Sequence, residues 1–207
     1  PCAGVGDVTA SSVVFPMLRC VRYLLACAIL AMPLAFAATV NAAQPPAVES
    51  SDPALRVKAA YLYKFAGYVE WPPGVFATED SPIVVGVIGD DDLEEILSRM
   101  IVGKTVNGRP LVTRRLEANS SLQGLHMLIV GALGAPTLQA IGDAVRGKPV
   151  LVVSDARQER MLDSMISFDL VDHHLRFNVA LKPAATSGLK LRALMLTAAR
   201  RVTRGDP

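Results

Sequence analysis

Residues 59–72 read AAYLYKFAGYVEWP, and this stretch gathers three of the four tyrosines, the only tryptophan and a phenylalanine into about four helical turns. No other segment of the chain is so aromatic. Ser51 or Asp52 can cap the start of a helix, and the proline that follows suits its first position. Two prolines after Trp71 prevent the helix from continuing. The pattern therefore predicts a helix over residues 53–70.

This helix carries two apolar stripes rather than one. The first stripe, which we expect to face the core, comprises Leu55, Ala59, Leu62, Phe65, Ala66 and Val69. The second comprises Tyr61, Lys64, Tyr68 and Trp71 at the same spacing, where the surface helix of a lone monomer would carry charges. Either a loop or the C-terminus of the same chain covers this second stripe, or it contacts another protein. In the second case Tyr61, Tyr68 and Trp71 are the candidate contact residues.

Composition limits the class of protein. A chain of 207 residues that is 51% hydrophobic has room for one well-buried domain. Lys plus Arg number 21 and Asp plus Glu 19, a net charge of +2, and no basic cluster alternates with aromatic residues, so we expect no nucleic-acid partner. The cysteines are Cys2, Cys20 and Cys27, which leaves the presumed domain without disulfides, thiolate zinc sites or a cysteine nucleophile.

The N-terminal part has the layout of a secretory signal. Met17 is followed by two arginines and then by an apolar run over residues 23–38. Small residues favour cleavage after Ala42, with Ala37 as a second candidate. A retained membrane anchor and lipidation at Cys27 are the alternatives, disfavoured by a proline within the run and by the shortness of the core before the cysteine.

These features divide the chain into four parts. We expect residues 1–16 to be a non-native or mis-called leader, 17–42 a signal peptide, 43–52 a flexible lead and 53–204 the folded domain. Cleavage of the signal would release the domain as an exported protein.

The rest of the domain alternates between buried strands and helices. Strands are predicted at 83–88, 104–116 (a pair around Asn107–Gly108), 125–130 and 149–153, with helices from about 90 to 100 and over 137–146. Short strands at 165–170 and 175–181 form a hairpin, and a last helix runs from about 186 to 202. The predicted fold is therefore α/β: a single three-layer domain whose mixed, mostly parallel sheet has helices on both faces and a C-terminal β-hairpin plus helix.

A ligand crevice is predicted at the carboxyl ends of the strands, where open α/β sheets bind ligands. Asp90, Asp91 and Asp92 follow the first buried strand, and Ser154 and Asp155 follow the third. Three carboxylates could hold Mg²⁺, but capping and the helix dipole also explain acidic residues at a helix start. Ser154 lacks the G-x-S-x-G elbow of a nucleophile, and the simpler interpretation is that it starts a turn.

The spacing of the histidines in the sequence does not predict a metal site. His173 and His174 are adjacent, so on a strand they point to opposite faces. Together with Asp172 they are expected at the polar tip of the hairpin, as a second candidate surface for a partner. His126 opens a buried strand and is predicted to be a hydrogen-bonded histidine of the core or sheet edge. The glycines match neither G-x-G-x-x-G nor a P-loop, and we expect no cofactor and no metal.

The AYLYKFxxYVEWP pattern resembles the helix that opens the mature domain of the YfiR-like periplasmic proteins. The resemblance continues through residues 103–111, 166–168, 175–179 and 188–191 and covers almost all of the chain after residue 52. It implies a periplasmic regulator that binds the periplasmic part of an inner-membrane diguanylate cyclase and holds it inactive, until an outer-membrane lipoprotein releases it. Some members carry disulfides in this domain, whereas this chain has no cysteine there. Asn178 matches a family position and is predicted to be a buried amide with a structural role.

The sequence thus favours a binding protein over an enzyme, because it shows no metal-ligand spacing, no catalytic triad and no phosphate loop. The resemblance implies control of cyclic-di-GMP signalling through a diguanylate cyclase or a similar sensor kinase. The alternative is a periplasmic domain that senses a small molecule and works with a histidine kinase or a transporter. The second aromatic stripe also makes a homodimer a hypothesis.

Overall fold

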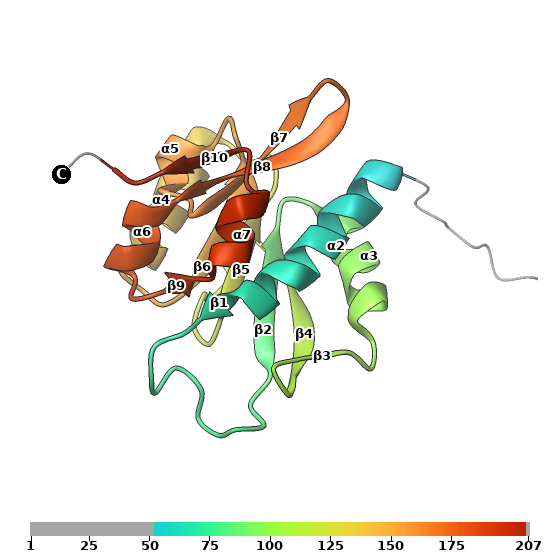
Figure 1. The fold of residues 1–207 in the computed structure, drawn as a ribbon, viewed down its shortest axis with the longest axis vertical. Coiled ribbons are helices and arrows are strands. Elements are labelled where there is room, and N and C mark those ends of the chain that lie inside the picture. Colours follow the sequence, from blue (N-terminus) through green and yellow to red (C-terminus); the bar gives the residue numbers. More distant parts are fainter. Residues whose placement is uncertain (1–51, 206–207) are drawn as a thin grey trace, which may run out of the picture. The chain divides into compact units, whose positions relative to one another are not determined.

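The computed structural model describes residues 52–205. The expected leader, the signal peptide and residues 43–51 of the lead lie outside this range. In chain order the elements are α2 (Pro53–Tyr68), β1 (Val69–Glu70), β2 (Ile83–Ile88), α3 (Asp91–Ile101), β3 (Thr105–Val106), β4 (Arg109–Leu116), β5 (Met127–Val130), α4 (Ala135–Val145), β6 (Leu151–Asp155), α5 (Glu159–Leu162), β7 (Ile166–Val171), β8 (His174–Ala180), α6 (Leu181–Thr186), β9 (Lys190–Leu191), α7 (Ala193–Ala198) and β10 (Arg201–Thr203) (Figure 1).

The main sheet has the strand order β10-β8-β7-β6-β5-β2-β4-β3. Neighbouring strands are parallel except for the hairpins β7–β8 and β3–β4. A separate two-stranded ladder joins β1 to β9. The prediction of a mixed, mostly parallel sheet is therefore confirmed.

Two hydrophobic cores lie on opposite faces of this sheet, and strand β5 shows how the sequence fills both. Met127 and Ile129 belong to the core beneath α2 and α3, while Leu128 and Val130 belong to the core beneath α4 and α5. Because side chains of a strand alternate between faces, a continuous apolar run serves both cores. The three layers are thus helices, sheet and helices, as predicted.

Helix α2 begins and ends for identifiable reasons. The Asp52 carboxylate accepts a hydrogen bond from the Ala54 amide at 2.8 Å and so caps the first turn. The helix ends at Tyr68, two residues before the predicted end. The next two residues, Val69 and Glu70, instead pair with Leu191 and Lys190 in the small ladder. Pairing with the distant strand β9 thus ends this helix before the two prolines are reached.

The predicted last helix over residues 186–202 is present, but it is much shorter than predicted, as α7. The chain there forms α6, β9, α7 and β10 in succession. Gly188 has a left-handed backbone, φ +69°, which ends α6, and the following residues add the strand β9 to β1. Arg201–Thr203 then pairs in parallel with β8. Backbone pairing with two strands therefore outweighs the helical spacing of the apolar residues in this segment.

The hairpin β7–β8 has the predicted polar tip. Asp172 and His173 both have positive φ, 49° and 61°, which is the backbone of a tight type I′ turn. The hairpin projects beyond the helices (Figure 1). Asn178, in β8, is buried as expected, but its Oδ1 accepts no hydrogen bond from the described residues. The amide therefore does not tie the strand to a helix through that atom.

Candidate functional site

The carboxyl ends of β2 and β6 are joined by a lysine of helix α2. Lys58 Nζ lies 3.3 Å from Oδ2 of Asp90 and 3.4 Å from Oδ1 of Asp155. The Lys58 side chain is only 11% exposed, and its ammonium lies 5.8 Å from the centre of the Phe168 ring. The predicted crevice thus contains two of its five candidate residues, but a lysine of the chain itself fills the space between them.

Lys58 is the residue that sequence reasoning missed, although a signal was present. It lies four residues before Leu62 and seven before Phe65, on the core stripe of the helix, where a charge is unexpected. A lysine in that position requires a buried or half-buried carboxylate as its partner. Asp90 and Asp155 are those partners.

The strand ends next to Lys58 are closed by backbone packing. A Cβ on Gly131, which follows β5, would lie 2.2 Å from the carbonyl oxygen of Gly89. Only glycine allows this approach. Gly89 and Gly131 therefore pack directly against each other at the switch point between β2 and β5, where open sheets of this class bind ligands.

The other predicted crevice residues lie apart from Lys58. Asp91 faces Arg115 at 3.5 Å on the surface, and Asp92 is exposed. Ser154 is buried, and its hydroxyl lies 2.6 Å from that of Ser164. Ser154 belongs to the packing of β6 and neither starts a turn nor reaches the cavities at this end of the sheet. Asp90 caps α3 through the Leu93 amide, in agreement with the capping interpretation.

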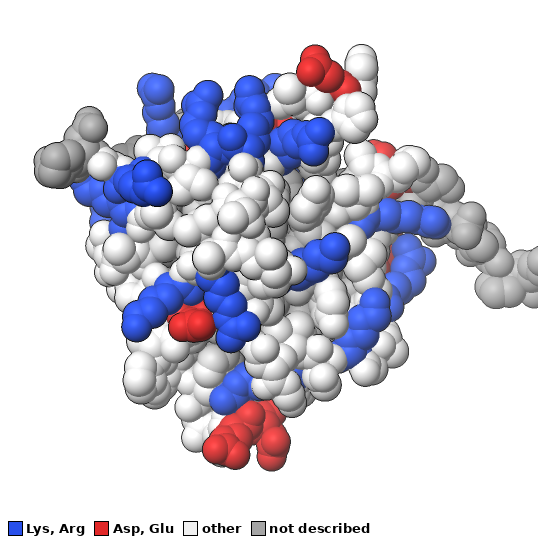
Figure 2. Space-filling view, in the orientation of Figure 1, with Lys and Arg blue, Asp and Glu red and all other residues white. Residues whose placement is uncertain are grey.

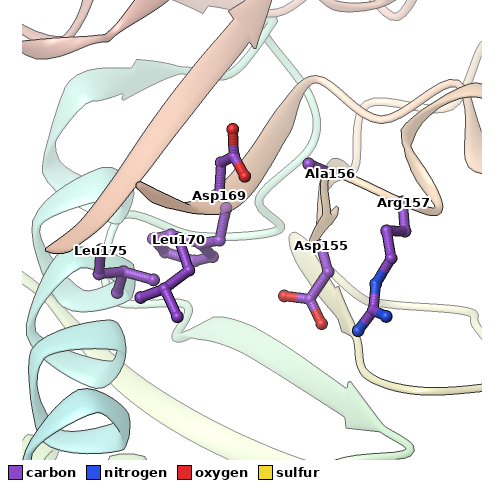
Figure 3. A pocket seen from close by; sticks show the side chains of 7 residues that line it. Asp155, Ala156, Arg157, Asp169, Leu170 and Leu175 are labelled. Carbon is purple, nitrogen blue, oxygen red and sulfur yellow. The ribbon is translucent and has the colours of Figure 1, made fainter. Parts of the chain in front are cut away.

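Two open cavities flank the end of β6 and share Asp155 and Arg157. One, of about 350 Å³, extends toward the hairpin, and the other, of about 410 Å³, toward Leu133 and Gln158. In the first cavity Asp155 and Arg157 face Leu170 and Leu175 of the hairpin (Figure 3). The hairpin side also contributes Asp169, whose carboxylate pairs with Arg200, so the lining combines charged side chains with leucines.

An apolar groove of about 260 Å³ lies between α2 and α7. Tyr61, Lys64 and Tyr68 form the α2 side, and Leu194, Thr197 and Ala198 form the α7 side. Leu194 is 62% exposed, which is unusual for a leucine at the edge of a groove. Tyr61 also packs against Phe65 and Phe177 in the core, with ring centres 5.9 and 5.5 Å apart. The second stripe is thus only partly covered by the C-terminal segment of the chain.

Trp71 has a different environment from the two tyrosines. Its Nε1 donates to the backbone carbonyl of His126 at 3.4 Å, and its ring meets Phe76 edge-on at 5.7 Å. A loop of the same chain therefore covers Trp71, which corresponds to the first of the two interpretations of the stripe. Tyr61 and Tyr68 stay as candidate contact residues beside the groove.

His126 is the hydrogen-bonded histidine that the sequence predicts. Its Nδ1 accepts from the Val84 amide at 3.1 Å, and its ring stacks on Phe76 at 4.4 Å with an angle of 5°. The guanidinium of Arg109 lies on the other face of Phe76, 4.0 Å from the ring centre. Burial lowers the pKa of His126, and the nearby positive charge of Arg109 adds to this effect.

The residues of the hairpin tip line neither the groove nor the cavities, although Leu170 and Leu175 beside the tip line the first cavity. Asp172, His173 and His174 are exposed, and Nδ1 of His174 lies 2.6 Å from the Asp172 carbonyl. Residues 52–205 contain no group of three or more His, Cys, Asp or Glu side chains that could hold a metal ion. Within the same range, no helix is long and apolar enough to cross a membrane.

The sequence matches a known protein family over most of the described domain. The family model described as YfiR/HmsC-like matches residues 55–200. The chain therefore belongs to the YfiR/HmsC-like family, whose members are periplasmic regulators associated with diguanylate cyclases. Among the curated proteins, none matches this chain significantly.

Replacing the bridging lysine tests its role in the fold. We expect Lys58→Met to lower the free energy of unfolding by about 2 kcal/mol, because it leaves two carboxylates close together without a cation. The value is at the low end for a broken buried pair because the Asp155 side chain is 40% exposed. Urea denaturation measures the change.

Lys64→Met on the exposed side of the same helix is the matched control, with an expected change within about 0.5 kcal/mol. Adding Asp90→Asn to Lys58→Met should recover part of the loss, since asparagine still caps α3 and one uncompensated charge is removed. Equal urea midpoints for Lys58→Met and the unmodified chain would contradict this account.

The lowered pKa of His126 predicts a pH dependence of stability. The unfolded chain binds a proton at His126 near its usual pKa of about 6.5, while the folded chain resists protonation. The neutral His126 ring therefore contributes fully to the free energy of unfolding above about pH 6.5, and this contribution is lost as the pH falls below that value. Urea denaturation between about pH 7.5 and 5.5 measures the slope.

His126→Asn is the control for this slope. Its side-chain oxygen can accept from the Val84 amide in place of Nδ1, but it does not titrate. The variant should lose stability at neutral pH through the lost stacking on Phe76, and should show a flatter pH profile. An identical slope in the two proteins would show that His126 is not the titrating group.

Proposed function

We propose that this chain is a periplasmic, non-enzymatic regulator that binds the periplasmic part of an inner-membrane diguanylate cyclase and represses it. The observation that supports this most directly is the apolar groove between α2 and α7, in a chain of the YfiR/HmsC-like family. The groove is formed by the segment that the sequence singled out as too aromatic for a lone surface helix.

The groove has the chemistry of a protein-binding surface. Tyr61 and Tyr68 supply large, rigid rings, and Leu194 supplies an exposed apolar side chain across from them. Lys64 is the charged residue among the lining side chains. A partner segment with an apolar ridge and an acidic neighbour for Lys64 would fit such a surface.

Repression in this proposal needs no catalysis by the regulator. The regulator binds one state of the cyclase's periplasmic domain more tightly than the other and shifts the population toward the inactive state. An outer-membrane lipoprotein that competes for the regulator would release the cyclase. Export through a cleaved signal at residues 17–42 would bring the domain to this compartment. In one variant of this proposal, a sensor kinase takes the place of the cyclase in the groove between α2 and α7. In another, a second copy of the regulator binds there and forms a homodimer.

A second function, the sensing of a small molecule, is favoured by the two cavities beside β6. Asp155 and Arg157 present opposite charges there, opposite the apolar side chains of the hairpin (Figure 3). Such a cavity suits a small zwitterion with an apolar part. The exposed hairpin residues Asp172–His174 would then be the nearest segment to respond to the ligand.

Substitutions in the groove test the main proposal. The mature chain, residues 44–207, is titrated against the purified periplasmic domain of a diguanylate cyclase from the same organism, with calorimetry as the readout. Leu194→Asp and Tyr68→Asp should each weaken binding at least about tenfold, because each places a carboxylate in an apolar contact.

Val102→Asp is the matched control, since Val102 is 77% exposed at the far end of α3 and lies outside the groove. It should bind like the unmodified chain. Equal affinity of all three variants would contradict the groove as the partner surface. Absence of binding by the unmodified chain, together with a thermal shift by a small zwitterion that Asp155→Asn abolishes, would favour the sensing function instead.

A further inference from the structure

Positive charge is concentrated in the last part of the described chain. Residues 173–205 contain seven lysines and arginines and no aspartate or glutamate, leaving 14 of the 21 basic residues and all 19 acidic ones for the rest. The seven are Arg176, Lys182, Lys190, Arg192, Arg200, Arg201 and Arg204, and all are exposed. Although the net charge of the whole chain is small, the charge is unevenly distributed and residues 173–205 are strongly basic.

Strand pairing brings these residues together at one edge of the sheet. β10 is the edge strand, and its Arg201 is opposite Asn178 of β8, two residues after Arg176. Lys182 packs beside the end of β10, because a Cβ built on Gly205 would lie 2.9 Å from the Lys182 Cδ. Arg204 is the residue before that glycine. We call Arg176, Lys182, Arg201 and Arg204 the basic edge.

Most of this charge is not neutralised by the protein. Arg200 pairs with Asp169 at 2.6 Å, and Arg192 pairs with Glu70 at 3.2 Å. The four residues of the basic edge form no ion pair with any residue of 52–205. Figure 2 shows lysine and arginine side chains gathered where β10, β8 and α5 lie in Figure 1, with few acidic side chains among them.

We propose that the basic edge docks onto the anionic phospholipid surface of a membrane. The charges line the outside of an edge strand and a neighbouring helix, and they do not converge on a cavity. Such an arrangement fits a flat, extended array of negative headgroups better than a single small anion. Long lysine and arginine side chains reach headgroups while the backbone stays in water.

Docking in this way would hold the regulator beside a membrane-bound partner. The groove between α2 and α7 has its own residues, and none of them belongs to the basic edge. Confinement at the membrane raises the local concentration of the regulator without any new protein contact. The inference concerns lipid alone and does not depend on which protein occupies the groove.

Vesicle binding tests this inference. The protein is purified from cells that express the full sequence, its N-terminus is determined by mass spectrometry, and its co-sedimentation is measured with phosphatidylglycerol vesicles and with phosphatidylcholine vesicles. We expect binding to the anionic vesicles alone, and weakening as salt rises from about 50 to 200 mM, because charge attraction is screened. Each basic residue near such a surface contributes roughly fivefold.

Charge reversal at the edge should abolish most of the binding. Arg176→Glu with Arg201→Glu and Arg204→Glu is expected to lower the partition coefficient at least about a hundredfold. The control reverses the same amount of charge elsewhere, with Arg99→Glu, Arg146→Glu and Lys148→Glu, and should bind far more tightly than the edge variant. Should the edge variant fail to fold by circular dichroism, Lys182→Gln with Arg204→Gln replaces it, with an expected loss of about twentyfold.

Three results would overturn the proposal. If the edge and control variants lost the same amount of vesicle binding, the net charge of the protein, and not the basic edge, would explain the binding. Absence of binding by the unmodified protein at low salt would exclude the lipid surface. Binding to an acidic polypeptide such as polyglutamate, without binding to anionic vesicles, would assign the edge to an acidic protein instead.

Discussion

Lys58 ties helix α2 to the carboxyl ends of the sheet, alongside the apolar residues that bury the helix in the core. Its ammonium reaches the ends of two strands that are separated in the sheet by β5, at Asp90 and Asp155. This contact lies at the carboxyl ends of the strands, the edge where open α/β sheets bind ligands. With the helix held there, its aromatic residues pack on one side into the core and on the other against α7. The strand ends thus carry the ion pairs of Lys58, while the groove between α2 and α7 stays open to solvent.

This arrangement separates the possible roles of the molecule in space. The groove between α2 and α7 is apolar, the cavities beside β6 combine opposite charges with leucines, and the edge at β10 is basic. Each surface suits a different kind of partner: a protein segment, a small zwitterion and an anionic lipid surface. In the proposed function, the first surface would bind the membrane protein while the third holds the domain at the lipid surface.

Much of the fold could be predicted from the sequence, because its signals are local. The buried apolar strands, the Asp90 cap and the hairpin turn at Asp172 follow from periodicity and turn chemistry. The C-terminal helix is shorter than predicted because β9 and β10, on either side of α7, pair with distant strands, which no local pattern reveals. Among the residues that line the groove, spacing singled out Tyr61 and Tyr68. Lys58 was missed because its partners lie 32 and 97 residues away in sequence.

The most direct test of the central claim is hydrogen–deuterium exchange of the regulator, with and without the periplasmic domain of its diguanylate cyclase. If the groove is the recognition surface, the partner should slow exchange in residues 61–68 of α2 and 193–198 of α7, and leave residues 155–162 beside the cavities unchanged. Protection confined to residues 155–162, or to the hairpin tip at 172–174, would contradict the account and move recognition to the other end of the domain.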